Sequence, residues 1–261
     1  MSLLFAAASC LAERIKINAI TRETREGRLL FVKRRRRSAR LTLACANHFF
    51  RVAGNPIRAL AGLPEWQRWE VECFRRLHGD PFHISTRGRR SVAAEALPGI
   101  PLSLALERRS LTAAMTAAAG RELRRSHETH CETFPDHWSH GDPHTGNFLY
   151  DPATDRARLI DFEVMHDPAL PAVARRADDL LVFLQDLAGR VSRSEWLLLA
   201  CAFLDAYGHR ETIAHLSPRL VIPRGIARLW WAIRTSYLPG AELAHRLELL
   251  REALRPDPVT A

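Results

Sequence analysis

The chain has 261 residues, of which 47% are hydrophobic and 26% charged, and its net charge is +9. This composition excludes a largely disordered chain and fits one or two domains with a hydrophobic core. No run of about 18 uncharged apolar residues occurs, so we expect no membrane span, and residues 1–12 lack the basic start of a secretory signal.

Positive charge is concentrated in the first part of the sequence. Residues 1–90 hold 19 Lys and Arg side chains against 7 Asp and Glu, a net charge of +12. The remaining 19 basic and 22 acidic side chains give −3. This asymmetry predicts two lobes of different electrostatic character. The basic part indicates an anionic partner such as phosphate, lipid head groups or nucleic acid. A solvated arginine-rich surface is the alternative.

The cysteines do not form a recognisable framework. They stand far apart and include no CxxC pair; the five are Cys10, Cys45, Cys73, Cys131 and Cys201. We therefore expect reduced thiols, as in a cytoplasmic protein.

The first predicted element is a hairpin. Residues 14–22 alternate apolar and polar side chains, which predicts a strand. Residues 29–33 form a second, apolar strand after a turn that contains Gly27. Four consecutive arginines follow at 34–37, and residues 38–50 have helical spacing.

A helix is predicted over residues 64–78, where Pro64 suits the first helical position. Its apolar stripe consists of Trp66, Trp69, Cys73, Phe74 and Leu77. Glu70 lies within this stripe, four residues from Trp66 and four from Phe74. We expect its carboxylate to point into the fold, where it needs a cationic partner or a shifted pKa.

Most of the remaining chain is predicted to be helical. A strand is expected over residues 91–97, a helix over 110–127, a loop over 134–147 and a short hairpin over 148–161. Further helices are expected over 178–188, 194–207, 222–236 and 241–254. Strands with one helix, followed by mostly helices, predict an α+β chain of two lobes, residues 1–96 and residues 97–261.

The densest group of polar residues lies near the middle of the chain. The run from His140 to Asn147 reads HGDPHTGN, and 14 residues after Asn147 come Asp161-Phe162-Glu163. The pattern HxDxxxxN, a short hairpin and then Asp-Phe resembles the catalytic and metal loops of the protein-kinase-like superfamily. The HGDxHxGN form is closer to the bacterial small-molecule branch, with aminoglycoside phosphotransferases and lipopolysaccharide-sugar kinases, than to ordinary protein kinases. The resemblance covers residues 15–185.

This resemblance implies a two-lobed fold, with a reduced β-rich N-lobe and a mostly helical C-lobe, and a phosphotransferase that uses ATP and Mg²⁺. Asp142 would orient an acceptor hydroxyl and receive its proton, and His140 would hold the loop. Asn147 and Asp161 would be the metal ligands. Amide and carboxylate oxygens are the ligands that this hard cation prefers.

The resemblance also assigns residues in the basic part. A strand lysine in the family contacts the nucleotide phosphates and pairs with a helix glutamate, and Lys33 and Glu70 match these positions. Lys33 is one of only two lysines in the chain, and its compact ammonium suits a phosphate site; alternatively, it merely begins the basic run. Glu95 and Leu97 resemble the hinge whose backbone meets the adenine edge.

One acid of the next helix also has a counterpart in the family. Asp178 or Asp179 resembles the buried aspartate that braces the catalytic loop. The alternative is a plain acid near the start of a helix, stabilised by the helix dipole.

Departures from the family pattern keep a nucleotide-binding pseudokinase open as an alternative. The sequence has no GxGxxG loop, Glu163 stands where glycine follows Asp-Phe, and no arginine precedes Asp142. A second alternative is a metal–histidine enzyme, because five histidines and Cys131 lie within residues 127–144. Their spacing matches no established zinc pattern.

The acceptor is expected to be a hydroxyl of a lipopolysaccharide sugar or another anionic glycolipid, given the basic N-terminal part. A soluble small molecule such as an aminoglycoside is the alternative. A glycolipid acceptor predicts peripheral contact with anionic lipid at the inner face of the inner membrane. Nucleic acid is not an expected partner, because no aromatic residue interrupts the arginine run and no binding motif is present.

Overall fold

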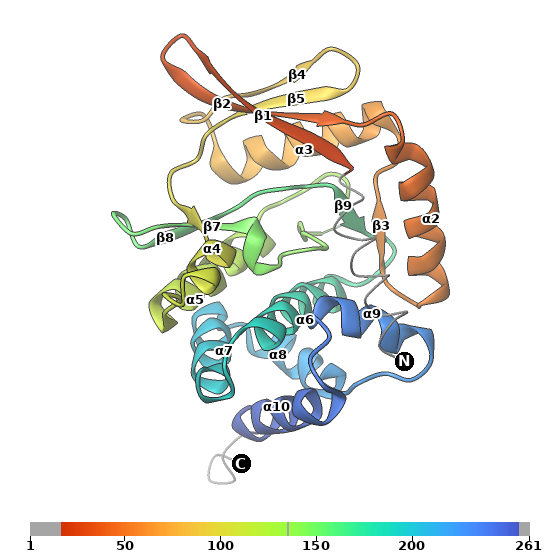
Figure 1. Cartoon of the computed structure of the whole chain (residues 1–261), viewed down its shortest axis with the longest axis vertical. Coiled ribbons are helices and arrows are strands. Elements are labelled where there is room, and N and C mark those ends of the chain that lie inside the picture. The colour runs from red at the N-terminus through yellow and green to blue at the C-terminus, as the bar shows by residue number, and fades with distance from the viewer. Residues whose placement is uncertain (1–16, 135, 256–261) are drawn as a thin grey trace. The chain divides into compact units, whose positions relative to one another are not determined.

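The computed structural model describes residues 17–134 and 136–255, and these fall into two compact units. Unit 1 contains residues 17–97 and also Asp161–Val164, and unit 2 contains the other described residues. Figure 1 shows the elements along the chain. Cys10, the beginning of the strand predicted over 14–22 and the apolar residues 1–12 lie outside the described residues.

Unit 1 is built on a four-stranded antiparallel sheet in the order β1-β2-β5-β4. Its strands are β1 (Asn18–Arg25), β2 (Arg28–Arg35), β4 (Ile84–Arg87) and β5 (Ser91–Glu95). The predicted hairpin is present, but it is centred later than expected, because the chain reverses at Glu26 and Gly27, which both have positive φ. β4 was not predicted, since its sequence ISTR has no apolar alternation.

Two helices and a short strand complete unit 1: α2 (Ala39–Val52), β3 (Ile57–Ala59) and α3 (Leu63–His78). The predicted apolar stripe of α3 is buried, and so is Glu70 within it. Gln67 is buried as well, because its amide donates to the carbonyl oxygens of Gly88 and Ser91 at 2.9 and 2.8 Å. These bonds fix α3 against the β4–β5 turn.

The strands of unit 2 come before and after the loop predicted over residues 134–147 in the chain. β6 (Ile100–Pro101), β7 (Phe148–Asp151) and β8 (Arg156–Leu159) form an antiparallel sheet, and the 3₁₀ turn η1 (Thr145–Asn147) precedes β7. The short strand β9 (Val164–His166) follows the metal-loop motif. The hairpin predicted over 148–161 therefore ends at Leu159, and Asp161 stands outside it.

Helices make up the rest of unit 2. They are α4 (Leu102–Glu107), α5 (Ala113–His127), α6 (Ala172–Arg190), α7 (Arg193–Tyr207), α8 (Arg210–Leu216), α9 (Ile226–Arg234) and α10 (Gly240–Ala253), with the 3₁₀ turn η2 (Ser217–Arg219) after α8. α6 begins well before the predicted residue 178, and α8 was not predicted. Phe183 and Phe203 stack at 4.0 Å between ring centroids in the core.

The predicted α+β class is confirmed: a small antiparallel sheet forms the N-terminal unit and mostly helices form the other. Helices α5 and α7 approach closely at Gly120, where an added Cβ would lie 2.2 Å from the Phe203 carbonyl oxygen of α7. In the part of the chain that the structure describes, no helix is both long and apolar enough to span a bilayer.

Candidate active site

Lys33 is the centre of a charged cluster in unit 1. Its Nζ lies 2.8 Å from Glu70 Oε1, 2.6 Å from Asp161 Oδ1 and 3.3 Å from Glu163 Oε1. β2 places Lys33, α3 places Glu70, and the segment Asp161–Val164 supplies the other two carboxylates. Lys33, Glu70 and Asp161, which were predicted as site residues from separate parts of the sequence, therefore lie together in the structure. Glu163 lies beside them.

The cluster contains three carboxyl groups and two cationic side chains. Three carboxylates face Lys33 and the buried Arg35, whose Nη2 is 3.8 Å from Glu163 Oε2. Burial acts to lower the pKa of Lys33, but Asp161, Glu70 and Glu163 outweigh it and hold that pKa well above its usual range. Burial and repulsion from Asp161 raise the pKa of Glu163 to about 8. A divalent cation beside Asp161 would relieve the repulsion among these carboxyl groups.

Asp161 adopts an uncommon backbone conformation, with φ of 70°. This is the left-handed region, which aspartate tolerates better than most residues but still at some cost. The following turn is held by a hydrogen bond from the Leu60 N–H to the Glu163 carbonyl oxygen at 3.0 Å. Burial raises the pKa of Glu70, and its Oε2 is buried without a hydrogen-bond partner. These features are typical of a site kept in a defined geometry for function.

In unit 2, Asp179 holds the loop that contains the HGDPHTGN motif. Its Oδ2 accepts the His140 N–H at 2.8 Å, and its Oδ1 accepts the Gly141 N–H at 2.7 Å. Gly141 has φ of 87°, a conformation that glycine adopts without strain. Asp179 lies in the middle of α6 and is fully buried, so the alternative of a helix-start acid is wrong. Asp178 instead contacts His166 Nε2 at 3.2 Å.

Tyr207 and His127 form a hydrogen-bonded chain that ends on the Asp179 carboxylate. Burial raises the pKa of Tyr207 to about 12, so its hydroxyl stays protonated and donates to His127 Nδ1 at 2.9 Å. His127 Nε2 then donates to Asp179 Oδ2 at 2.9 Å. Burial acts to raise the pKa of Asp179, but His166 and the hydrogen-bonded His127 lower it to about 2. Asp179 is therefore ionised and saturated with donors.

His140 is enclosed by the loop rather than exposed to an acceptor. Its Nε2 donates to the Ile160 carbonyl oxygen at 3.0 Å, and its Nδ1 accepts the Asp142 N–H at 3.2 Å. Its ring also meets Trp138 edge-on, with centroids 5.6 Å apart. These contacts give His140 a positioning role for the backbone of Asp142.

Asp142 and Asn147 are joined through the backbone of the loop. The Asn147 Nδ2 donates to the Asp142 carbonyl oxygen at 2.9 Å, which leaves the amide oxygen Oδ1 as the free ligand atom. The Asp142 side chain is 36% exposed, unlike the buried Asp179. A partly exposed carboxylate on a braced loop can meet a substrate hydroxyl, and an amide oxygen suits Mg²⁺.

Solved structures with a related overall fold were found at low sequence identity. A Mycobacterium tuberculosis protein solved with erythromycin is 18% identical over 92% of this chain and 73% of its own, with a TM-score of 0.39. The aminoglycoside phosphotransferase APH(2'')-Ib, solved with ADP, is 11% identical over 97% of this chain and 99% of its own, with a TM-score of 0.38.

The bifunctional kinase-methyltransferase WbdD is 18% identical over 80% of this chain, with a TM-score of 0.36, and the match spans 45% of its own length. No family model matches the sequence, and no curated protein matches it.

Two cationic contacts of the loop were not predicted. Arg234 of α9 places Nη2 3.3 Å from Asp142 Oδ1, and its guanidinium lies 4.6 Å from the Trp230 ring centroid.

Thr145 is held by Asp186 of α6, whose Oδ2 accepts its N–H at 2.9 Å and its hydroxyl at 2.5 Å. Arg190 donates to the same hydroxyl at 3.3 Å. The only sequence signal was the presence of these charged residues in helices with otherwise apolar faces.

The predicted hinge residues lie at the end of unit 1. The Glu95 N–H is used by the His83 carbonyl oxygen at 2.7 Å, and its carboxylate accepts from Arg28 at 3.0 Å. Hydrogen bonds from His83 N–H and Arg28 lower the pKa of Glu95. Within the described ranges, the Leu97 N–H makes no hydrogen bond. Of the two, Leu97 therefore has the backbone donor that remains free for an adenine edge.

The histidine-rich segment does not assemble a metal centre. Among residues 17–134 and 136–255, no three His, Cys, Asp or Glu side chains converge on one ion site. His127 and His140 are used in the loop scaffold, and His144 Nδ1 accepts the Gly146 N–H at 3.0 Å. Cys45, Cys73, Cys131 and Cys201 are free thiols. The geometry therefore does not support the metal–histidine alternative over the part of the chain that is described.

Proposed function

We propose that the protein is an ATP- and Mg²⁺-dependent phosphotransferase that acts on an alcohol group. The observation that carries the proposal is the braced loop, in which Asp179 fixes the backbone of His140 and Gly141 while the Asp142 carboxylate stays partly exposed. Asp142 would accept the proton of the attacking hydroxyl and hold that hydroxyl in line. His140 would keep Asp142 in place through the backbone.

The residues of the two units would divide the remaining work. Lys33, oriented by Glu70, would contact the phosphate oxygens, and the backbone at Glu95 and Leu97 would meet the adenine edge. Asp161 and Asn147 would hold Mg²⁺. When bound, Mg²⁺-ATP supplies the phosphoryl group and the metal charge that phosphoryl transfer requires. The Asp161 carboxylate beside Lys33 and the oriented Asn147 amide support this assignment.

The acceptor we propose is a sugar hydroxyl of a lipopolysaccharide or another anionic glycolipid. The support is the net charge of +12 over residues 1–90, which favours an anionic substrate and peripheral contact with anionic lipid at the inner face of an inner membrane, from the cytoplasm. An aminoglycoside-type small molecule is the second candidate. A cationic acceptor needs an acidic pocket, and the net charge of −3 over the rest of the chain is compatible with one.

The test is Mg²⁺-dependent ATP binding and turnover in wild type, Asp142→Asn and Asp161→Asn. We expect a thermal shift with Mg²⁺-ATP in wild type and Asp142→Asn, a weakened shift in Asp161→Asn, and loss of turnover in both variants. Asp167→Asn, an exposed acid on a loop of unit 2, is the matched control. Turnover at the wild-type rate in Asp142→Asn would refute the proposed role of that residue.

Acceptor classes separate the remaining alternatives. A panel of deacylated lipopolysaccharide, intact glycolipid in micelles and an aminoglycoside would be assayed for ³²P transfer from labelled ATP. Transfer to the first two supports the anionic glycolipid, and transfer to the third alone supports the small-molecule candidate. Nucleotide binding with no transfer to any class would indicate a pseudokinase.

A further inference from the structure

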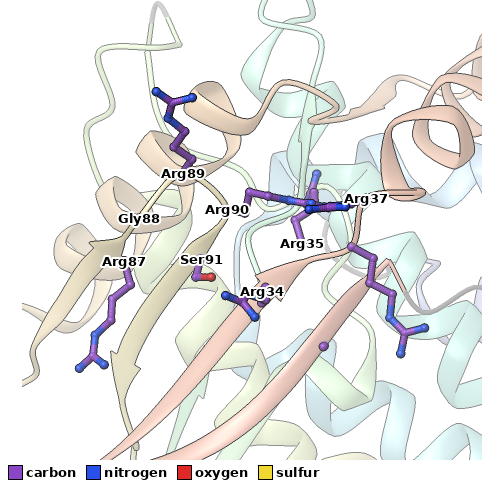
Figure 2. A pocket seen from close by; sticks show the side chains of 10 residues that line it. Arg34, Arg35, Arg37, Arg87, Gly88, Arg89, Arg90 and Ser91 are labelled. Carbon is purple, nitrogen blue, oxygen red and sulfur yellow. The ribbon is translucent and has the colours of Figure 1, made fainter.

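Unit 1 contains an arginine-lined pocket that the proposed catalysis does not use. Its volume is about 510 Å³, and seven arginines line it: the consecutive Arg34–Arg37 and three from the β4–β5 turn, Arg87, Arg89 and Arg90. Lys33, Glu70, Asp161 and Glu163 are not among its lining residues. Figure 2 shows Arg87 and Arg89 directed outward from the turn, with Arg90 reaching in the direction of Arg35.

The sheet register explains why two distant arginine segments meet. Arg34 of β2 pairs with Ser91 of β5, and the Arg35 N–H donates to the Arg90 carbonyl oxygen at 2.8 Å. Gly88, with φ of 59°, allows the tight turn that brings Arg89 and Arg90 back beside β2. The Gln67 amide fixes the same turn through the Gly88 carbonyl oxygen. The arginines are therefore held together by backbone geometry, against their mutual repulsion.

Few carboxylates offset this charge. Arg87 pairs with Glu23 at 2.9 Å, and Arg35 lies 3.8 Å from Glu163. Among the described residues, the other five arginines of the pocket form no ion pair, and no acidic side chain lines it. The Nε of Arg90 is buried without a hydrogen-bond acceptor, whereas the buried Arg35 guanidinium already has partners within unit 1. Buried guanidinium nitrogens without acceptors are costly, and an anion would satisfy them.

The size and chemistry of the pocket select the ligand. Arginine binds phosphate through paired N–H donors, and the volume lies within the range of small-molecule sites. A single inorganic phosphate would leave most of the five unpaired guanidinium groups without a counter-charge. We propose that this pocket binds a ligand with two or more phosphate groups. This site is separate from the proposed nucleotide site at Lys33.

Two sources could present that chemistry: a soluble polyphosphorylated molecule and a phosphorylated lipid head group. Side chains alternate across a strand, so Arg34 and Lys33 project from opposite faces of β2. Arg34 can therefore be changed without replacing a residue that faces the Lys33 cluster, and neither Arg37 nor Arg90 forms an ion pair with that cluster among the described residues. Arg35 is left intact in the test because it also contacts Glu163.

The experiment measures tripolyphosphate and orthophosphate binding by calorimetry at fixed ionic strength. The variant is the triple substitution Arg34→Gln, Arg37→Gln and Arg90→Gln. The control removes the same charge from exposed arginines of unit 1, Arg40→Gln, Arg51→Gln and Arg68→Gln. We expect tripolyphosphate to bind wild type at least tenfold more tightly than orthophosphate. The variant should lose at least tenfold in affinity and the control less than twofold.

Vesicles then distinguish the sources. Wild type would be sedimented with vesicles that contain a phosphatidylinositol bisphosphate, with tripolyphosphate as competitor, against phosphatidylserine vesicles of equal charge. Selective binding to the bisphosphate lipid that tripolyphosphate displaces supports the lipid source. Tripolyphosphate binding by calorimetry without selective vesicle binding supports the soluble source. Equal loss in variant and control, no tripolyphosphate binding, or oligonucleotide binding that tripolyphosphate does not displace would each overturn the proposal.

Discussion

The guanidinium Nη2 of Arg234 lies 3.3 Å from Oδ1 of Asp142, although α9 is far from the loop in sequence. Arg234 is 9% exposed in its side chain and also stacks on Trp230, so its position is fixed by packing as well as by charge. Because Arg234 holds Oδ1 of Asp142, the Asp142 side chain is restricted to few rotamers, and its other oxygen has a defined position for contact with a substrate hydroxyl. Arg234 is thus a positioning residue of the proposed chemistry.

We expect Arg234→Gln to lower kcat about tenfold or more, because a less oriented base loses the advantage of a fixed geometry. The Kd for Mg²⁺-ATP should stay within about twofold. Arg234→Lys should recover part of the rate. Arg228→Gln on the exposed face of the same helix is the control. Steady-state kinetics and calorimetry make the measurement, and a parallel loss of ATP affinity in Arg234→Gln would contradict a role confined to Asp142.

Lys33 and Glu70 should differ in what their removal costs. Lys33→Met leaves three carboxylates of the cluster with Arg35 alone, so we expect a loss of stability of about 3 kcal/mol. The affinity for Mg²⁺-ATP should fall at least tenfold. Glu70→Gln leaves Lys33 with Asp161 and Glu163, so its stability loss should be smaller. Thermal unfolding without ligand, followed by calorimetry with Mg²⁺-ATP, compares them. Equal destabilisation by the two substitutions would rule out Lys33 as the shared cation.

Acid stability should depend on Asp179. Its pKa in the folded protein is about 2, below the usual 3.8, so its contribution is complete above about pH 4 and is lost as the pH falls toward 2. We expect Asp179→Asn to unfold more easily at pH 6 by about 2 kcal/mol, and the difference from wild type to shrink between pH 4 and pH 2. Urea unfolding at several pH values provides the data.

The acid-stability experiment also needs a reference acid. Asp205→Asn, an exposed acid on α7, should show no such convergence with wild type. If the gap between Asp179→Asn and wild type stays constant down to pH 2, the buried carboxylate is not the source of the acid sensitivity.

The contact of α5 with α7 should tolerate no side chain at Gly120. An alanine Cβ there would lie 2.2 Å from the Phe203 carbonyl oxygen, so the helices must separate. We expect Gly120→Ala to cost about 1–3 kcal/mol and to lower Tm by several degrees. Gly240→Ala, whose Cβ would meet only the flexible end of Arg228 at 3.4 Å, should leave Tm unchanged or raise it. Calorimetry on both proteins decides, and a stable Gly120→Ala variant would show that the contact is adaptable.

The sequence indicated residues well where a local period or a dense motif identifies them. Glu70 was predicted to point inward because it interrupts an apolar helical stripe, and the structure buries it beside Lys33. The choice between Asp178 and Asp179 stayed open, because adjacent residues of a helix differ by about 100° in direction and only the packing of α6 decides which one faces the loop.

Other contacts had no signal in the sequence. Arg234 and Asp186 reach the loop from helices that come much later in the chain, and no spacing rule connects them to Asp142 or Thr145. The four arginines at 34–37 were read as one run, but β2 ends at Arg35, so Arg34 and Arg35 project from opposite faces of the strand and the other two lie beyond it. Tertiary register, which composition does not encode locally, sets these relationships.

The buried carboxylate of Asp179 also limits how often the loop at residues 140–147 opens to solvent. The N–H groups of His140 and Gly141 both end on this side chain, in the middle of a 19-residue helix. Such amides exchange with deuterium only when the surrounding core opens, whereas amides of ordinary surface loops exchange within seconds to minutes. We therefore expect the His140 and Gly141 amides to be among the slowest to exchange in the protein. Although they lie in a loop, their exchange rates should be those of core amides.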